Sequence, residues 1–143
     1  MRIADVLSNK GAAVTTIAPE ATVSQLLAGL AALNIGAMVV VGPDGLIGIV
    51  SERDVVRKLH ERGGSLLGQP VSEIMTTVVR TCTPRDTVDH LAVLMTQNRV
   101  RHVPVLDDGR LIGIVSIGDV VKTRMEELET GQQQLQDYIT QGG

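Results

Sequence analysis

Two serine–aspartate pairs carry the clearest possible chemistry in this chain of 143 residues. Ser51 precedes Asp54 by three residues, and Ser116 precedes Asp119 with the same spacing. A carboxylate accepts two hydrogen bonds in one plane, which suits the neighbouring hydroxyls of a ribose. A serine hydroxyl can donate to a phosphate or sugar oxygen, and the N–H groups at a helix start favour an anion. The structural alternative is that each aspartate only caps the first turn of a helix.

Three basic side chains are candidates for binding a phosphate: Arg53, Arg101 and His102. Arginine is a permanent cation with a forked set of donors, and histidine adds a donor whose charge depends on pH. The alternative is that all three are solvated surface charges.

Both serine–aspartate pairs lie in a repeated unit. Leu46–Ser51 recurs unchanged as Leu111–Ser116, at an offset of 65 residues. Further upstream, residues 3–7 resemble residues 71–75 at an offset of 68. A unit of about 60 residues is marginally stable alone, so the two repeats should pack face to face.

The two repeats predict the same order of elements: strand, helix, strand, strand, helix. Short β-branched runs that end at a proline predict the first strands, at residues 14–17 and 78–82. Thr22 and Thr87 are typical N-caps for the helices that follow. The other elements are predicted as helices 23–33 and 88–97, strands 37–41 and 102–106, strands 46–50 and 111–115, and helices 52–61 and 118 onward. The fold class is therefore α/β, two β-α-β-β-α repeats packed with pseudo-two-fold symmetry.

The predicted division is a first repeat at 1–67, a second repeat at 68–124 and a C-terminal helical tail at 125–143. Residues 63–70 form the linker, because they combine glycines with a proline. Spacings of four and three alternate along the tail, as in a short heptad seam, at Val121, Met125, Leu128, Gln132, Leu135 and Ile139. A helix packed on its own domain, a dimer contact and a frayed tail are all open interpretations.

Composition excludes several classes of function. Aromatic residues make up 1% of the chain, with Tyr138 alone, which excludes stacking of nucleobases on aromatic rings. A net charge of −3 without a basic run argues against nucleic acid. The single cysteine, Cys82, and the absence of a signal peptide or an apolar run of about 18 residues indicate a cytoplasmic protein with no membrane contact. No metal-ligand spacing and no nucleophile–base pair is recognisable, so we expect no catalysis.

The chain resembles the cystathionine-beta-synthase (CBS) domain family from about residue 3 to residue 124. The motifs that carry the resemblance are Gly48–Asp54, Gly113–Asp119, Val100–Leu106 and Met75-Thr76. The resemblance implies a tandem pair that forms one disc-like, stand-alone module and that dimerises. It also implies that adenine nucleotides bind in crevices between the repeats and that a protein in trans is regulated.

In that family, one repeat supplies the aspartate of a crevice and the other supplies most of the wall around the base. The resemblance implies that the first crevice combines Asp119, Ser116 and Ile114 with Ala12, Ile35, Gly36 and Ala37. It implies that the second combines Asp54, Arg53, Ser51 and Ile49 with Thr77, Val100, Arg101 and His102.

The two crevices are not chemically equal. Gly36-Ala37 replaces Arg101-His102 in the first repeat, and Gly118 stands where the first repeat has Arg53. The first crevice is therefore expected to be weaker, or roomy enough for a larger nucleotide such as NAD.

The sequence thus predicts a regulatory module that senses AMP, ADP, ATP or NAD, needs no catalytic cofactor, and acts as a homodimer. The alternatives are a structural dimerisation or adaptor protein with vestigial pockets and, less favoured, an enzyme acting on a nucleotide.

Overall fold

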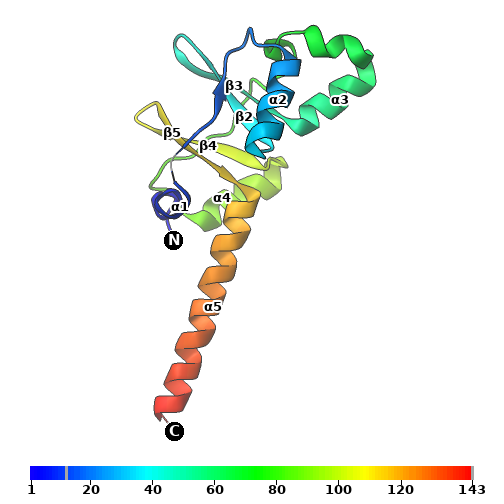
Figure 1. The fold of residues 1–143 in the computed structure, drawn as a ribbon. Coiled ribbons are helices and arrows are strands. Elements are labelled where there is room, and N and C mark those ends of the chain that lie inside the picture. The colour runs from blue at the N-terminus through cyan, green and yellow to red at the C-terminus, as the bar shows by residue number, and fades with distance from the viewer. Residues whose placement is uncertain (12, 143) are drawn as a thin grey trace.

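The two repeats form two small β-sheets with helices around them in the computed structural model, which describes residues 1–11 and 13–142 (Figure 1). The N-terminal half holds α1 (Ile3–Lys10), β1 (Thr16–Ile17), α2 (Val23–Leu33), β2 (Ala37–Gly42), β3 (Gly45–Ser51) and α3 (Glu52–Arg62). Two short 3-10 helices follow, at Gly63–Gly68 and Val71–Glu73. The C-terminal half holds α4 (Val88–Asn98), β4 (His102–Asp107), β5 (Arg110–Ser116) and α5 (Ile117–Gly142). The predicted α/β class and the tandem repeat are confirmed.

The two hairpins match each other closely. β2 and β3 pair antiparallel with Ala37 opposite Ser51, and β4 and β5 pair with His102 opposite Ser116. Each serine is the last residue of its strand, so each aspartate lies in the first turn of the helix that follows. The predicted caps are also confirmed, because Thr22 Oγ1 accepts a hydrogen bond from the Gln25 N–H and Thr87 Oγ1 accepts one from the His90 N–H.

The first strands are shorter than predicted. β1 covers two residues instead of 14–17, and residues 78–82 contain only one isolated parallel bridge, from Cys82 to Val105. In the first repeat, the Val39 N–H donates to the Thr15 carbonyl at 3.3 Å. The residue that matches Val39 in the second repeat is Pro104, which has no N–H to donate. The prediction of a strand at 78–82 was therefore wrong, and the missing donor on the neighbouring strand is the reason.

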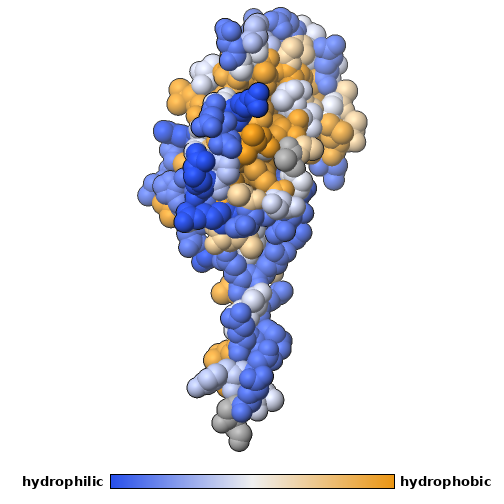
Figure 2. Space-filling view, turned by 90° about the vertical axis from the view of Figure 1, so that its left-hand side faces the viewer, coloured by the Kyte–Doolittle hydropathy of each residue, from blue (hydrophilic) through white to orange (hydrophobic). Residues whose placement is uncertain are grey.

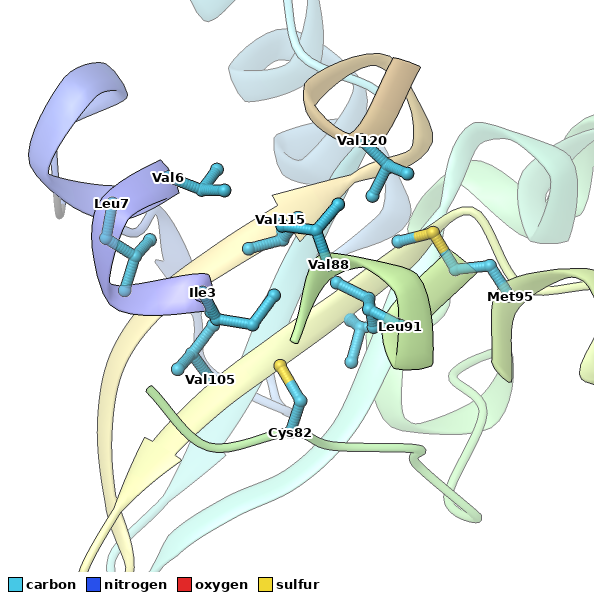
Figure 3. Close-up of a cluster of buried hydrophobic side chains, with 11 residues drawn as sticks. Ile3, Val6, Leu7, Cys82, Val88, Leu91, Met95, Val105, Val115 and Val120 are labelled. Carbon is cyan, nitrogen blue, oxygen red and sulfur yellow. The ribbon is translucent and has the colours of Figure 1, made fainter. Parts of the chain in front are cut away.

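The hydrophobic cores exchange segments between the repeats. Ile3, Val6 and Leu7 of α1 lie in the core built by α4, β4 and β5 (Figure 3). In return, Val71 and Ile74 lie in the core built by α2, β2 and β3. The packing therefore crosses the predicted division after residue 67, and the two segments that resemble each other at an offset of 68 play equivalent parts.

α5 runs far beyond the rest of the molecule, with the C-terminus at its outer end (Figure 1). Val120 and Thr123 are buried, whereas Leu128 and Ile139 are 66% and 63% exposed. Only the start of the helix thus packs on its own domain, and the tail is helical up to Gly142. No helix in the described residues is both long and apolar enough to cross a bilayer.

The exchange of α1 leads to a prediction about Gly113. A Cβ atom at this position would lie 2.6 Å from Leu7 Cδ2, which is too close without movement. Gly113→Ala should lower the free energy of unfolding by about 1–3 kcal/mol, measured by denaturant titration, because it overpacks the contact between α1 and β5. When Leu7→Ala is combined with Gly113→Ala, the loss of stability should be smaller than the sum of the two single losses, because the shortened side chain makes room for the new methyl group.

Gly131→Ala is the matched control, because a Cβ there meets nothing within 4 Å on α5. It should leave the protein as stable as the wild type or slightly more stable. A Gly113→Ala variant of wild-type stability would contradict the described contact.

Candidate functional site

The two serine–aspartate pairs form the same structure at the starts of α3 and α5. The Ser51 N–H donates to Asp54 Oδ2 at 2.8 Å, and the Asp54 N–H donates back to Ser51 Oγ at 3.4 Å. The corresponding distances for Ser116 and Asp119 are 2.8 and 3.2 Å. Both aspartates therefore do cap the first turn of a helix, which was the structural alternative considered for them. This capping uses Oδ2 only, and among the described residues neither Oδ1 atom accepts a hydrogen bond, so each carboxylate keeps one oxygen for another donor.

Lys10 is a residue of the candidate site that sequence reasoning missed. It is the last residue of α1, and its Nζ donates to Asp119 Oδ2 at 2.6 Å and to the Ile114 carbonyl at 2.8 Å. The offset of 68 could have pointed to it, because Leu7 and Met75 already match as neighbours of Gly113 and Gly48. The residue that matches Lys10 is Val78, which is 75% exposed, so among the described residues no lysine takes the equivalent place beside Asp54.

The ammonium group of Lys10 changes the charge state of Asp119. Partial burial of this carboxyl would by itself raise its pKa. The hydrogen bonds from Lys10 and Ser116 and the charge of Lys10 outweigh that effect and hold the pKa of Asp119 below its ordinary value of 3.8. Asp119 is therefore an anion that is already paired with a cation.

Gly36 and His102 mark the place where the repeats meet. A Cβ at Gly36 would lie 3.5 Å from His102 Nε2 and 3.2 Å from Glu52 Oε1. The imidazole of the second repeat thus lies within ordinary van der Waals contact of a side chain at position 36, and the Glu52 carboxylate would be the more crowded neighbour. Gly36 was predicted for the first crevice and His102 for the second, and the fold brings these two residues together.

Burial lowers the pKa of His102 below its ordinary value of 6.5. The charges of Glu52 and Asp119 raise this pKa, whereas those of Lys10 and Arg101 lower it. His102 is therefore neutral at pH 7, where one ring nitrogen can donate and the other can accept.

On the Asp54 side, backbone pairing joins β3 to the segment of the other repeat that was predicted to form the wall. The Ile49 N–H donates to the Thr76 carbonyl at 3.0 Å, and the Thr76 N–H donates back at 2.8 Å. Thr77 is therefore held close to β3, because the residue before it, Thr76, makes these two hydrogen bonds to Ile49. Arg53 lies exposed in the first turn of α3.

The remaining predicted residues occupy several environments. Ile35 and Val100 pack against the first and second cores respectively, and Ala37 is buried. Arg101 is exposed, and its carbonyl accepts the Ile117 N–H at 2.8 Å. Ala12 lies outside the described residues.

Two hollows lie near these elements. One, of about 640 Å³, runs along the start of α5 and has Arg101 in its wall. The other, of about 570 Å³, lies between the two hairpins and is lined by apolar residues such as Val41, Leu46 and Leu111. In the described part of the chain, no three acidic, histidine or cysteine side chains group as a metal site.

The CBS domain matches this chain twice, over residues 3–61 and 71–126. The chain belongs to the CBS domain family. A mitochondrial CBS domain-containing protein of Arabidopsis thaliana is 39% identical over 150 residues, covering 99% of this chain and 72% of that protein.

CBS-pair structures share the fold. A CBS domain-containing protein of Agrobacterium tumefaciens has 44% identity and a TM-score of 0.84, covering 86% of this chain and 92% of that one. The CBS domain pair of a further protein has 26% identity and a TM-score of 0.79, covering 89% and 98% of the two chains. That domain pair was solved in complex with 5-methylthioadenosine and S-adenosyl-L-methionine.

The contact between Lys10 and Asp119 predicts how this carboxyl titrates. Lys10→Met should raise the pKa of Asp119, because it removes both the hydrogen bond and the neighbouring charge that favour the carboxylate. NMR titration of the side-chain carboxyl carbons measures this shift. Lys58→Met is the control, since Lys58 pairs with Glu61 on α3 instead. An Asp119 titration that is unchanged in Lys10→Met would contradict the ion pair.

The lowered pKa of His102 predicts a dependence of stability on pH. Below about pH 6.5 the unfolded chain protonates this histidine while the folded CBS pair resists protonation, so the free energy of unfolding should fall as the pH decreases. His102→Gln should flatten this dependence, as measured by denaturant titration between pH 7 and pH 5. His90→Gln, on the exposed side of α4, should keep the wild-type slope. Equal slopes for all three proteins would show that burial of His102 does not affect stability.

Proposed function

We propose that this CBS pair is a regulatory module that senses adenine nucleotides in the two crevices between its repeats. The observation that carries the proposal is the pair of aspartates at helix starts, each with one carboxylate oxygen without a hydrogen-bond donor among the described residues. A related CBS pair that binds adenosine-containing ligands supports the ligand class. AMP, ADP, ATP and NAD are the ligands we propose to test.

In the first crevice, the Oδ1 atom of Asp119 is available to a ribose hydroxyl, and Ser116 and Ile114 lie on the same strand end. Lys10 supplies the cation that Gly36 and Ala37 lack. A ligand phosphate would compete with Asp119 for the Lys10 ammonium, which favours nucleotides over adenosine.

In the second crevice, Asp54 takes the sugar while Arg53, Arg101 and neutral His102 supply donors to the phosphates. Because Lys10 has no counterpart here, the two crevices should differ in affinity and in preferred nucleotide.

The first turns of α3 and α5 can transmit ligand binding to the rest of the protein. The Glu52 N–H donates to the Gly36 carbonyl at 3.0 Å, and the Ile117 N–H donates to the Arg101 carbonyl at 2.8 Å. A ligand that shifts these wall residues therefore shifts the first turns of α3 and α5. We propose that a protein in trans reads this change, that the module acts as a homodimer without catalysing a reaction, and that it is cytoplasmic.

A structural adaptor is the second candidate. Two observations favour it: Lys10 already pairs with Asp119, and α5 projects an exposed apolar stripe. The binding experiment below decides between the two functions.

Calorimetric titration with AMP, ADP, ATP and NAD should show binding. At a ligand concentration of 100 times the dissociation constant, the free energy of unfolding should rise by about 2.7 kcal/mol per occupied site. Flat titrations together with an unchanged melting temperature would reject nucleotide sensing and leave the adaptor.

Asp54→Asn and Asp119→Asn separate the two crevices. Asparagine keeps an acceptor for the serine N–H but removes the charge, so each variant should fold and lose affinity in one crevice only. Methyl signals of Ile49 and Ile114 report the second and first crevice separately by NMR. Asp44→Asn, on an exposed hairpin turn, is the control and should bind like the wild type. Undiminished affinity in both variants would mean that the two aspartates serve only as caps.

A further inference from the structure

Five of the exposed apolar side chains of α5 form one stripe along the helix. This α5 seam consists of Val121, Met125, Leu128, Gln132, Leu135 and Ile139, and its five apolar members are all more than half exposed. Figure 2 shows the projecting part of α5 as a narrow, largely hydrophilic rod with isolated hydrophobic side chains.

The α5 seam lies off the side of the helix that packs most closely on the chain's own body, although its first members, Val121 and Met125, line the hollow beside Arg101. The side of the helix that contacts the body carries Val120 and Thr123, which are 5% and 6% exposed. Residues in a helix advance by about 100° each, so the seam lies on a different side of α5. Two copies can therefore approach along the seam while each body stays on its own side.

We propose that the α5 seam pairs with the α5 seam of a second copy as a parallel, in-register, two-stranded coiled coil. This inference deepens the homodimer of the proposed function and rests on that homodimer, but it does not depend on nucleotide binding. The alternation of four and three places Met125, Gln132 and Ile139 at a positions and Val121, Leu128 and Leu135 at d positions.

Gln132 selects the parallel arrangement. In a parallel, in-register pair it faces Gln132 of the second copy, and the two amides can donate to and accept from each other. An antiparallel pair with full overlap would place Gln132 opposite Leu128 of the second copy. The amide would then be covered without a partner, which costs free energy.

The flanking charges favour the same arrangement. Arg124 lies at a g position and Glu129 at the following e position, which are neighbours across a parallel pair. The in-chain contacts of Arg124, to Asp89 at 2.5 Å and Glu127 at 3.1 Å, both use Nη1, so other donors of the guanidinium remain for Glu129 of the second copy. The antiparallel pair would instead bring the two Glu129 side chains together.

Disulfide trapping in the full chain tests the arrangement. Leu135→Cys should give a covalent dimer under mild oxidation, because in-register d positions face each other within disulfide reach. In the antiparallel pair, residue 135 faces residue 125, so the two introduced thiols would be about 15 Å apart along the axis. Thr130→Cys is the matched control, since Thr130 lies on the outer side of the helix and should not cross-link.

The native Cys82 should not interfere. It is 4% exposed, and burial together with the charge of Asp86 raises its pKa to about 12, so it should not form disulfides in the wild type. Equal cross-linking of Leu135→Cys and Thr130→Cys, or none in either, would overturn the parallel arrangement.

Sedimentation measures the strength of the contact. Leu128→Asp should raise the dimer dissociation constant by roughly thirtyfold or more, because it places a charge at a central position of the seam. Thr130→Asp should leave this constant unchanged. A monomeric wild type at micromolar concentration, or a dimer unaffected by Leu128→Asp, would overturn the seam proposal. The calorimetric result for nucleotides is separate, so failure of one proposal is distinguishable from failure of the other.

Discussion

Each half of this molecule needs a segment from the other half to complete its core. Ile3 and Leu7 of α1 pack with the C-terminal repeat, and Val71 and Ile74 pack with the N-terminal repeat. Backbone hydrogen bonds tie both segments in place, from Ile3 to Asp86 at 2.9 Å and from Val71 to Ala21 at 2.7 Å. A unit of about 60 residues is marginally stable alone, so this exchange favours folding of the two repeats as one unit.

The same exchange determines the chemistry of the candidate site. Because α1 lies beside β5, its last residue reaches the Ile114 carbonyl and Asp119. On the other side, the matching position is the exposed Val78. A nearly symmetric framework thus holds two carboxylates with closely similar capping geometry but different electrostatic surroundings.

Single-residue differences between the repeats change the local structure of each repeat. Pro104 in place of Val39 removes one donor and reduces a strand to a single bridge. Gly36 lies beside His102 of the other repeat, and burial between the repeats lowers the pKa of that imidazole. Each difference acts through a contact with a distant part of the chain, so its effect is visible only when both repeats are placed together.

The sequence by itself determined the repeats, the types and order of nearly all elements, the Thr22 and Thr87 caps, and the position of each aspartate at a helix start. These features depend on local signals: hydrophobic period, turn residues and side chains that bond within a few positions. Only the tertiary structure decided that α1 packs with the second repeat, that Lys10 pairs with an aspartate 109 positions away, that Pro104 shortens the neighbouring strand, and that the apolar members of the α5 seam stay more than half exposed. The physical reason is that these contacts join residues far apart in the chain, and their distances follow from how the whole pair packs rather than from any local preference.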